Sequence, residues 1–228
     1  MGEINNINVN LSESSSQYNY EVIPISPKPV YNFFKRLFDL ILCSLALVVL
    51  SPLFLVVAIL IKLEDGGSVF YHQPRHGLNR KVFQIYKFRS MCVDADKKQK
   101  EIEHLNEVDG PIFKIAHDPR ITKIGRFLRK TSIDELPQLI NIIKGDMSIV
   151  GPRPLPTYET EQLTESECQR LKVKPGLTCY WQISGRSNTS FKELIELDFK
   201  YIKERSLWTD FKIICKTFVT VFRGEGAY

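Results

Sequence analysis

A run of 22 residues without a charged side chain, from Leu40 to Ile61, limits what this chain can fold into more than any other feature. As a straight helix with a rise of about 1.5 Å per residue it would be roughly 33 Å long, enough to cross a hydrocarbon core about 30 Å thick. The run continues into Lys62-Leu63-Glu64 rather than into the small residues of a signal-peptide cleavage site. We therefore expect this segment to lie in a membrane.

Ser51 and Pro52 stand at the midpoint of the run and leave two topologies open. Pro52 lacks a backbone N–H and its ring collides with the carbonyl four residues earlier, so it kinks or breaks a helix. Cations flank the run on both sides, at Lys35, Arg36 and Lys62. Because basic flanks set orientation, this symmetry does not favour opposite sides. The segment is either one kinked span or a helix-break-helix that enters and leaves by the same face, with Ser51 or its neighbours satisfying the backbone groups that Pro52 frees.

Asp39 immediately precedes the uncharged run. In a helix that returns to the face it entered, this carboxylate would lie at headgroup depth. We then expect it to be close enough to Lys35 or Arg36 to form an ion pair.

The composition changes sharply at the start of the membrane segment. Residues 1–34 are rich in Asn, Ser, Glu and Pro and have too few apolar residues to form a core, so we expect a mobile tail. Residues 35–62 form the membrane segment, and residues 63–228 are long enough for one principal domain. Five scattered cysteines without a C-x-x-C pair argue against a zinc site or a disulfide framework. The net charge of +5 suits phosphate-bearing partners or an anionic membrane surface.

Beyond the membrane segment, the residue patterns predict an α+β, helix-rich domain. Two aromatic and β-branched runs around a Gly/Asn turn, within 68–91, predict a small β-hairpin. Residues 93–106 and 159–171 have the composition of polar surface helices, and residues 191–206 that of an amphipathic helix packed on a core. Near the C-terminus a stripe recurs at helical spacing, at Trp208, Phe211, Ile214, Cys215, Phe218, Val219 and Phe222. This stripe is either a core face or the lipid side of an amphipathic interfacial helix.

Asp134 and Glu135 stand side by side between two helical patterns. The first pattern predicts four cations along one side of a helix, at Arg120, Lys123, Arg126 and Arg129. The second follows the i, i+3, i+4, i+7 rule and ends at Lys144-Gly145, with apolar residues at Leu136, Leu139, Ile140 and Ile143. Both carboxylates therefore fall at a helix N-terminus, where the macrodipole favours negative charge. They are either ordinary helix caps or part of a site that handles phosphate.

Basic residues in loops favour the second interpretation. Four of them stand beside Pro, Gly or aromatic residues, at Lys87, Arg89, Arg153 and Arg186, and a fifth, Arg129, lies five residues before Asp134. Arginine binds phosphate bidentately, so together with the acidic pair they would suit a phosphate clamp. No Walker or G-x-G-x-x-G glycine motif is present, and the four histidines show no metal spacing. Mg²⁺ needs only one or two carboxylates beside phosphate oxygens and waters, so the dyad could hold it.

Several long motifs occur in one order along the chain. They are KRLFD, the SP at the middle of the apolar run, YKFRSM, DPRITKIGRFLRKTSIDELPQL, KGDMSIVGPRP, KPGLTCYWQISGR and FRGEGAY. From Lys35 to Tyr228 the chain thereby resembles the monotopic phosphoglycosyl transferases. These are bacterial sugar transferases that prime polysaccharide synthesis on polyprenyl (undecaprenyl) phosphate.

The resemblance implies an enzyme that transfers a sugar 1-phosphate from a UDP-sugar to polyprenyl phosphate and releases UMP. It implies that Asp134 is the nucleophile, forms a covalent phosphosugar intermediate and contacts Mg²⁺. Glu135 would assist in acid-base chemistry or positioning. Arg129, Arg153 and Arg186 match phosphate-binding arginines of the family, and Lys87 and Arg89 match a motif near its active site. A carboxylate nucleophile divides one hard displacement into two easier ones.

The resemblance also implies a re-entrant membrane helix and a catalytic domain, residues 63–228, on the cytoplasmic face of the bacterial inner membrane. The chain lacks the multi-span N-terminal region of larger members, so we expect a compact, catalytically sufficient form. The closing GEGAY favours the exopolysaccharide and capsule group, with glucose or galactose donors. Expected partners are the UDP-sugar, polyprenyl phosphate and membrane lipids, and homo-oligomerisation stays open. The alternative is a membrane-anchored adaptor without catalysis; nucleic acid is not an expected partner because the basic excess is modest and no recognition module is visible.

Overall fold

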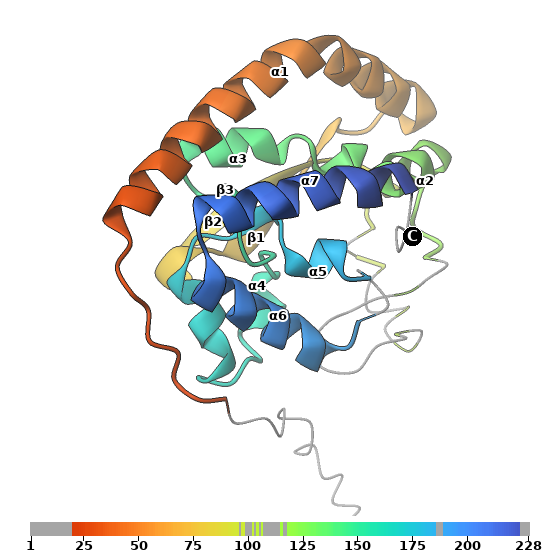
Figure 1. Ribbon diagram of the computed structural model, residues 1–228. Coiled ribbons are helices and arrows are strands. Elements are labelled where there is room, and N and C mark those ends of the chain that lie inside the picture. Colours follow the sequence, from red (N-terminus) through yellow and green to blue (C-terminus); the bar gives the residue numbers. More distant parts are fainter. Residues whose placement is uncertain are drawn as a thin grey trace, which may run out of the picture.

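The computed structural model describes residues 20–95, 97–98, 102, 104, 106, 115, 118–185 and 189–223. Within them the fold is helix-rich, with one long N-terminal helix and two small sheets. Figure 1 shows that this helix, α1 (Pro29–Asp65), arches over α3 (Gln138–Lys144) and curves back toward the body of the molecule. The fold class predicted from the sequence, a helix-rich domain with a small β-hairpin and a long apolar N-terminal helix, is confirmed.

The remaining elements are short except for the last two helices. The strands are β1 (Phe70–His76), β2 (Val82–Phe88), β3 (Ser148–Val150) and β4 (Gly176–Thr178). The α-helices are α2 (Lys123–Lys130), α4 (Thr157–Thr160), α5 (Tyr180–Ile183), α6 (Phe191–Glu204) and α7 (Leu207–Arg223). The short 3₁₀-helices are η1 (Leu78–Arg80), η3 (Ile133–Glu135) and η4 (Glu167–Lys172).

The helix α1 continues through Pro52 instead of breaking there. Pro52 has no N–H for the carbonyl of Val48, four residues earlier, and the Ser51 hydroxyl donates to that carbonyl at 2.8 Å. The side chain thus satisfies the group that the proline frees, as the sequence predicted. Because the hydrogen bond is restored locally, the helix bends and does not unwind, so the expected helix-break-helix is a single curved helix.

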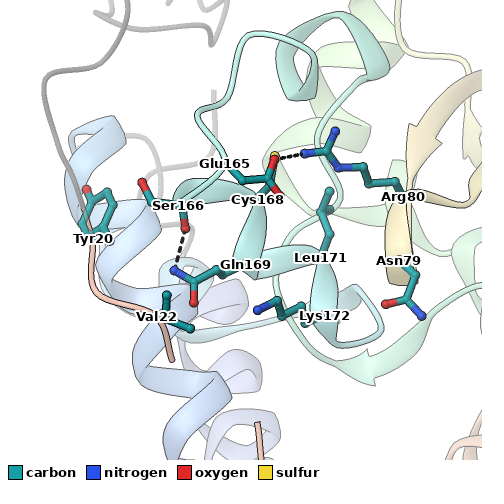
Figure 2. A pocket seen from close by; sticks show the side chains of 10 residues that line it. All are labelled: Tyr20, Val22, Asn79, Arg80, Glu165, Ser166, Cys168, Gln169, Leu171 and Lys172. Carbon is teal, nitrogen blue, oxygen red and sulfur yellow. Dashed lines mark hydrogen bonds and ion pairs between the residues drawn. The ribbon is translucent and has the colours of Figure 1, made fainter. Parts of the chain in front are cut away.

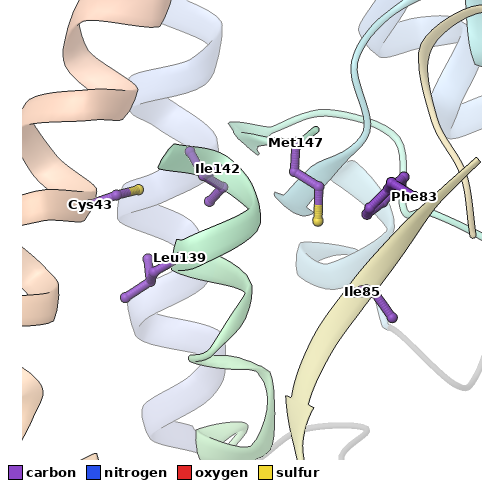
Figure 3. Close-up of a cluster of buried hydrophobic side chains, with 6 residues drawn as sticks. All are labelled: Cys43, Phe83, Ile85, Leu139, Ile142 and Met147. Carbon is purple, nitrogen blue, oxygen red and sulfur yellow. The ribbon is translucent and has the colours of Figure 1, made fainter. Parts of the chain in front are cut away.

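The two halves of α1 pack on the same body from the same side. In the first half the Cys43 side chain, 1% exposed, points toward Leu139 and Ile142 on α3, which pack in turn on Phe83 and Met147 (Figure 3). The second half contributes a separate cluster in which α1 meets β2 and α2, at Val57, Ile61, Phe88 and Leu128. The opposite face of α1 is exposed and apolar along its length. Among the described residues α1 is one helix that is long and apolar enough to cross a membrane.

Polar side chains near the start of α1 are bonded to distant parts of the body. Lys35 forms an ion pair with Asp210 at 2.6 Å, and both guanidinium nitrogens of Arg36 donate to carbonyls at the end of α3. Asp39 accepts hydrogen bonds from the Ser148 hydroxyl at 2.7 Å and from the N–H of residue 149 at 3.1 Å. The expected pairing of Asp39 with Lys35 or Arg36 is therefore wrong, because β3 supplies better-placed donors and the two cations have other partners.

The β-hairpin predicted within 68–91 is confirmed. Strands β1 and β2 pair antiparallel in a register that sets Tyr71 opposite Lys87. The turn between them includes η1, in which Asn79 adopts the left-handed conformation with φ 54°. Asn tolerates this region better than most residues, which explains its place at the turn.

A second sheet, which the sequence did not predict, joins β3 and β4 in parallel. Gly151 follows β3 and donates its N–H to Thr178, while Gly176 donates its N–H to Pro152. A Cβ at Gly176 would lie 2.0 Å from the Gly151 nitrogen, so only glycine allows the two backbones to approach this closely. This contact fixes the loop that carries Arg153.

The two C-terminal helices are confirmed. Ser190 and Glu193 form a capping box at the start of α6. In α7, Ile213 is fully buried, whereas large apolar side chains on another face are exposed, at Trp208, Phe211, Phe218 and Val219. Most of the predicted stripe therefore faces outward rather than into the core. The side chain of Phe222 lies outside the described part of the chain.

The chain before α1 is packed against the body from Tyr20 onward. Ile23 is buried against α6, and its N–H donates to the Gln169 side chain at 2.6 Å. Figure 2 shows Tyr20, Val22 and Gln169 on one side of a hollow of about 450 Å³ beside η1 and η4. The structure thus places residues 20–28 on the body and begins α1 at Pro29, before the tail boundary expected at residue 34.

The segment 159–171, expected as a polar surface helix, is also packed. It contains α4 and η4, and it buries both polar and apolar side chains, at Glu159, Glu167, Cys168, Arg170 and Leu171. Hydrogen bonds and an ion pair compensate the buried polar groups. Residues 93–106 lie in part outside the described residues, so the second surface helix stays a prediction.

Candidate active site

The carboxylates of Asp134 and Glu135 lie in η3, before α3 begins. α3 starts at Gln138, with Pro137 in the N-cap position and no capping side chain. Ser132, the other candidate cap, adopts a left-handed conformation with φ 57° and its side chain makes no capping bond. The helix-capping interpretation of the pair is therefore wrong for α3. The proline delays the helix, because its missing N–H is tolerated at the start of a helix and not in its interior.

Glu135 is held by two cations from other elements. Its Oε1 accepts from Lys87 Nζ of β2 at 2.8 Å and from Arg153 Nη2 of the loop after β3 at 2.7 Å. All three side chains are largely buried. Although burial opposes ionisation, Arg153 and Lys87 hold the pKa of Glu135 well below its usual range, and Glu135 in turn raises the pKa of Arg153. Glu135 is therefore expected to be ionised at neutral pH.

Asp134 is buried like its neighbour, at 7% exposed, but it makes neither of these ion pairs. Among the described residues no hydrogen bond joins its carboxylate to a partner. Burial, with repulsion from Glu135, raises the pKa of Asp134 to about 6, while Lys87, Arg129 and Arg153 oppose the shift. The site therefore combines an ion-paired carboxylate, Glu135, with an uncommitted carboxylate, Asp134, which makes no ion pair and has a pKa closer to neutrality. Such a pair is typical of reactive groups.

Arg129, at the end of α2, is the third cation in electrostatic contact with Asp134. Its Nε donates to the Ser90 hydroxyl at 2.9 Å. Burial lowers the pKa of Arg129, and the nearby Asp134 opposes this shift without reversing it. The sequence analysis did not predict Ser90 as a site residue. Its place after Lys87 and Arg89 in the YKFRSM motif is the only sequence feature that could have indicated it.

Two further arginines support the loop that carries Arg153. Arg170 donates to the Arg153 carbonyl at 2.7 Å and forms a fully buried ion pair with Asp198. Arg75 donates to the Pro154 carbonyl at 2.9 Å. The Arg153 guanidinium itself lies 5.3 Å from the centre of the Trp181 ring. None of these supports could be predicted, because each contact joins residues that are distant in the sequence.

The other predicted cations have different positions. Arg89 forms an ion pair with Asp65 at the end of α1 and packs against Gly67, so it ties the membrane helix to β2. Arg186 lies outside the described residues. Arg120 precedes α2 and is buried in a pair with Asp118, so the expected row of four cations on one helix face is wrong. Three of the five predicted basic residues therefore meet at the dyad, namely Lys87, Arg129 and Arg153.

The donor set limits how a metal could bind. Among the described residues no three His, Cys, Asp or Glu side chains form a metal-binding group. Glu135 is engaged by two cations, which leaves Asp134 as the uncommitted carboxylate of the dyad. One carboxylate fits Mg²⁺ when phosphate oxygens and waters supply the other ligands, and it does not fit a metal held by protein alone.

The hollow in Figure 2 lies away from this dyad. It is lined by residues from the chain before α1, from η1 and from η4. Arg80, which lines the hollow, precedes β2, and Lys87 lies five residues beyond Val82, where the strand begins, a span of roughly 17 Å. The hollow and the acidic pair are therefore separate features.

Comparison with known proteins identifies the family. The sequence profile of the family described as bacterial sugar transferase matches residues 30–224. "Galactosyl transferase CpsE" of Streptococcus agalactiae is 45% identical over 242 residues, covering 100% of this chain and 53% of that protein. "Exopolysaccharide production protein ExoY" of Rhizobium meliloti is 42% identical over 205 residues, covering 88% of this chain and 91% of that protein.

A third relative carries a more detailed name. "UDP-glucose:undecaprenyl-phosphate glucose-1-phosphate transferase" of Escherichia coli is 41% identical over 214 residues, covering 89% of this chain and 43% of that protein. The chain thus spans about half the length of several curated relatives that it matches, and most of the length of ExoY. The profile covers the chain from the start of α1 to the end of α7, including every residue of the described dyad and its cations. The chain belongs to the bacterial sugar transferase family.

Proposed function

We propose that the protein transfers a sugar 1-phosphate from a UDP-sugar to polyprenyl phosphate and releases UMP, as the initiating step of exopolysaccharide or capsule synthesis. The names of the relatives in Escherichia coli and Rhizobium meliloti support this reaction and this setting. The observation that carries the proposal is the uncommitted carboxylate of Asp134. It lies buried beside three cations and an ion-paired neighbour, which suits a nucleophile that must meet a phosphoanhydride.

The reaction would occur in two displacements. In the first, an Asp134 oxygen attacks the sugar-bearing phosphorus of the UDP-sugar. The bond from that phosphorus to the bridging oxygen breaks, and UMP leaves with the electron pair. In the second, a phosphate oxygen of polyprenyl phosphate attacks the same phosphorus, which frees the Asp134 carboxylate and gives polyprenyl-diphospho-sugar. This scheme predicts ping-pong kinetics.

The cations would act on the charge of the phosphates. Lys87, Arg129 and Arg153 lie around Asp134 from three different elements. Their positive charge permits a diphosphate to approach a carboxylate, and it stabilises negative charge that develops on UMP as it departs. Because these side chains are buried and held by Glu135 or Ser90, they need little rearrangement when the substrate binds.

Glu135 would act by positioning. A carboxylate with two ion pairs and a pKa well below its usual range is a poor proton carrier at neutral pH. Its contacts with Lys87 and Arg153 orient both cations toward the neighbouring Asp134. Of the two roles that the sequence left open for Glu135, these contacts favour positioning over acid-base chemistry.

Mg²⁺ is the proposed cofactor. Asp134 would hold it, together with oxygens of the substrate diphosphate and water molecules. When bound, the ion supplies charge neutralisation at the phosphates. Asp134 would thus have two functions, and its removal should abolish both.

The contacts of α1 support a monotopic, re-entrant arrangement with the catalytic body on the cytoplasmic face. Both halves of the helix pack on one body, through Cys43 in the first half and Val57 in the second. Both ends are also tied to it, through Lys35 with Asp210 and Asp65 with Arg89. A straight span would carry one end about 30 Å away across the hydrocarbon core and break one of these sets of contacts.

The experiment that tests the proposal is a UMP-release assay with detergent-solubilised protein, polyprenyl phosphate, Mg²⁺ and a panel of UDP-sugars. We expect turnover with UDP-glucose or UDP-galactose, and a hexose-phosphate adduct on the Asp134 peptide when the acceptor is left out. Asp134→Asn should abolish both signals. Asp94→Asn, which changes an exposed carboxylate outside the dyad that pairs with Lys97, is the matched control and should retain both.

Two results would contradict the proposal. Release of UMP by Asp134→Asn at the wild-type rate would exclude Asp134 as the nucleophile. Absence of turnover with every UDP-sugar, with lipid binding intact, would favour the alternative of a membrane-anchored adaptor, for which the exposed apolar face of α7 would be the contact surface.

A further inference from the structure

We propose that Asn141 of α3 is a positioning residue that takes the place of a third strand beside β2 and thereby holds Lys87 against the Asp134–Glu135 pair. The inference deepens the proposed function and rests on it. The Asn141 side chain contacts neither Asp134 nor Glu135. It also contacts none of the side chains that we propose bind the substrate. Its action is on the backbone of the strand that presents Lys87.

The geometry at Asn141 is that of a two-point clamp. Its side chain is 0% exposed. Its Oδ1 accepts from the Tyr86 N–H at 2.9 Å, and its Nδ2 donates to the Gln84 carbonyl at 2.7 Å. These two backbone groups are the donor and the acceptor that a neighbouring strand would use.

The clamp is needed because β2 has a strand on one side only. The sheet has two strands, in the order β1-β2, and the second edge of β2 faces α3. Pro74 stands opposite Gln84 in the register and has no N–H. The backbone groups at Gln84 and Tyr86 therefore point away from β1, and without Asn141 these part-buried groups would lose their hydrogen-bond partner in the protein.

Chemistry allows one orientation of the Asn141 amide. The Tyr86 N–H can only donate and the Gln84 carbonyl can only accept, so the side-chain oxygen must face the first and the nitrogen the second. An apolar side chain of the same size would satisfy neither group. A carboxylate would satisfy the Tyr86 N–H and repel the Gln84 carbonyl.

The clamp lies between the two parts of the site. Lys87 is the residue after Tyr86, and Glu135 precedes Asn141 by six residues in the continuous η3–α3 segment. Asn141 contacts the backbone of Gln84 and of Tyr86, which are two residues apart in β2. These two contacts fix the distance between α3 and β2 and also the position of α3 along the strand. The 2.8 Å contact between Lys87 and Glu135 depends on that position.

Apolar packing alone would set this position less strictly. Ile85, between the two clamped residues, packs in the cluster with Leu139 and Ile142. Such contacts are non-directional and tolerate sliding, whereas hydrogen bonds weaken steeply when they are displaced or bent. Asn141 also anchors the next turn, because its own carbonyl accepts from the N–H groups of Gly145 and Asp146 at 3.1 and 3.0 Å.

The experiment is a double-mutant cycle in the UMP-release assay. Asn141→Ala should lower kcat/KM by about 10- to 100-fold, since a displacement of about 1 Å at a reacting group has effects of that size. In a Lys87→Ala background the same change should lower it by less than about twofold, because the side chain it positions is gone. Asn141→Asp, which keeps the shape and one of the two bonds, replaces Asn141→Ala if the alanine variant does not fold.

The matched control is Ile195→Ala. Ile195 is fully buried in α6, in a cluster that contains no residue of β2 or α3. It should lower the melting temperature, and its effect on turnover per folded molecule should be the same in both backgrounds. If Asn141 only stabilised the fold, Asn141→Ala would behave like Ile195→Ala and lower kcat/KM equally in both backgrounds. A 10- to 100-fold loss of kcat/KM in the Lys87→Ala background would therefore overturn the proposal.

A measurement without turnover separates this proposal from the proposed function. Hydrogen exchange at the Tyr86 amide should accelerate at least tenfold in Asn141→Ala, and Lys87 should react faster with an amine-modifying reagent. Both changes are expected even if the wild-type protein releases no UMP from any UDP-sugar, a result that would remove the proposed function only. Unchanged exchange at Tyr86 and unchanged labelling of Lys87 would remove the clamp.

Discussion

Asp134 and Glu135 are adjacent in the chain, but the pKa of Asp134 is raised and that of Glu135 is lowered. Contacts from other elements cause this difference. Glu135 meets cations that are 48 positions before it and 18 positions after it. The sequence identified the pair and three of the cations that surround it, because reactive residue types in loops are visible locally. It could not predict which carboxylate is ion-paired, nor that Arg89 pairs with Asp65 of α1, since those facts depend on the packing of β2, α1 and the loop after β3.

The pKa of Asp134 predicts an effect on stability. Its unfolded pKa is 3.8 and its folded pKa is raised to about 6, so this group makes the folded state progressively less stable as pH rises from about 3.8 to about 6, and the loss is complete above that. Above pH 7 the buried charge therefore destabilises the protein, by an amount on the order of 2–3 kcal/mol. Asp134→Asn should raise the melting temperature by several degrees at pH 8 and by about a third as much at pH 4.5, where the unfolded carboxyl is only partly ionised.

Thermal unfolding without substrate and with a chelator present checks this prediction, since bound ligands would stabilise the wild-type protein. Glu135→Gln is the contrasting variant. It leaves Lys87 and Arg153 buried without their partner and should lower the melting temperature at pH 8. A lower melting temperature for Asp134→Asn at pH 8 would contradict the buried, uncommitted state of Asp134.

The same pKa predicts the pH dependence of the reaction. The nucleophile must be ionised, so kcat/KM for UMP release should fall tenfold per pH unit below about pH 6, the value for free Asp134. Glu135 should add no second limb in this range, because its pKa lies well below the usual value. A limb near pH 4 would show that Asp134 is not desolvated in the free enzyme.

At the scale of elements, the long periodic segments were predictable and the short ones were not. The hairpin, α1, α6 and α7 follow from patterns of ten or more residues, and the structure has them all. β3 and β4 have three residues each, and they form because Gly151 and Gly176 let two backbones meet, a contact between positions 25 residues apart. The curvature of α1 was predictable at Pro52, but its continuity depends on the Ser51 hydroxyl.

The outward face of α7 should contact lipid. Its only tryptophan, Trp208, is 63% exposed, stacks on Phe211 and lies under the ammonium group of Lys212. In a Trp181→Phe variant reconstituted in bilayers, lipids brominated on the acyl chain should quench the fluorescence of Trp208. The Trp208→Phe variant, which reports on Trp181 beside Arg153, is the control and should be quenched much less. Equal quenching of both would place α7 away from the interface.

At the scale of the whole molecule, α1 and the body form one unit. The sequence indicated a membrane segment followed by a separate domain, with a tail before it. The structure joins them, because Lys35, Arg36, Asp39 and Asp65 all bond to the body and residues 20–28 cover α6. Such long-range contacts have no local pattern, so neither the early start of α1 nor the packed segment before it could be predicted.

The joined arrangement predicts the topology in cells. In a background with Cys92 and Cys215 replaced by serine, single cysteines are introduced at Ser14 in the tail and at Glu165 in the body. If α1 returns to the face it entered, neither should react with an impermeant maleimide in intact cells, and both should react in inverted vesicles. Labelling of Ser14→Cys from outside, with Glu165→Cys protected, would identify α1 as a single span.

The anchors of α1 also have a consequence for the order of events during synthesis. Tyr31 and Lys35 bond to Asp210, which is made 179 and 175 residues later, and Asp39 bonds to Ser148, which is made 109 residues later. At about 5–20 residues per second, the start of α1 waits roughly 10–35 s after emerging before its last partner exists. The helix α1 is therefore made long before its packing can be completed, and a nascent chain stalled before α7 would leave Lys35 and Tyr31 without the Asp210 carboxylate and open to chaperones and membrane proteases.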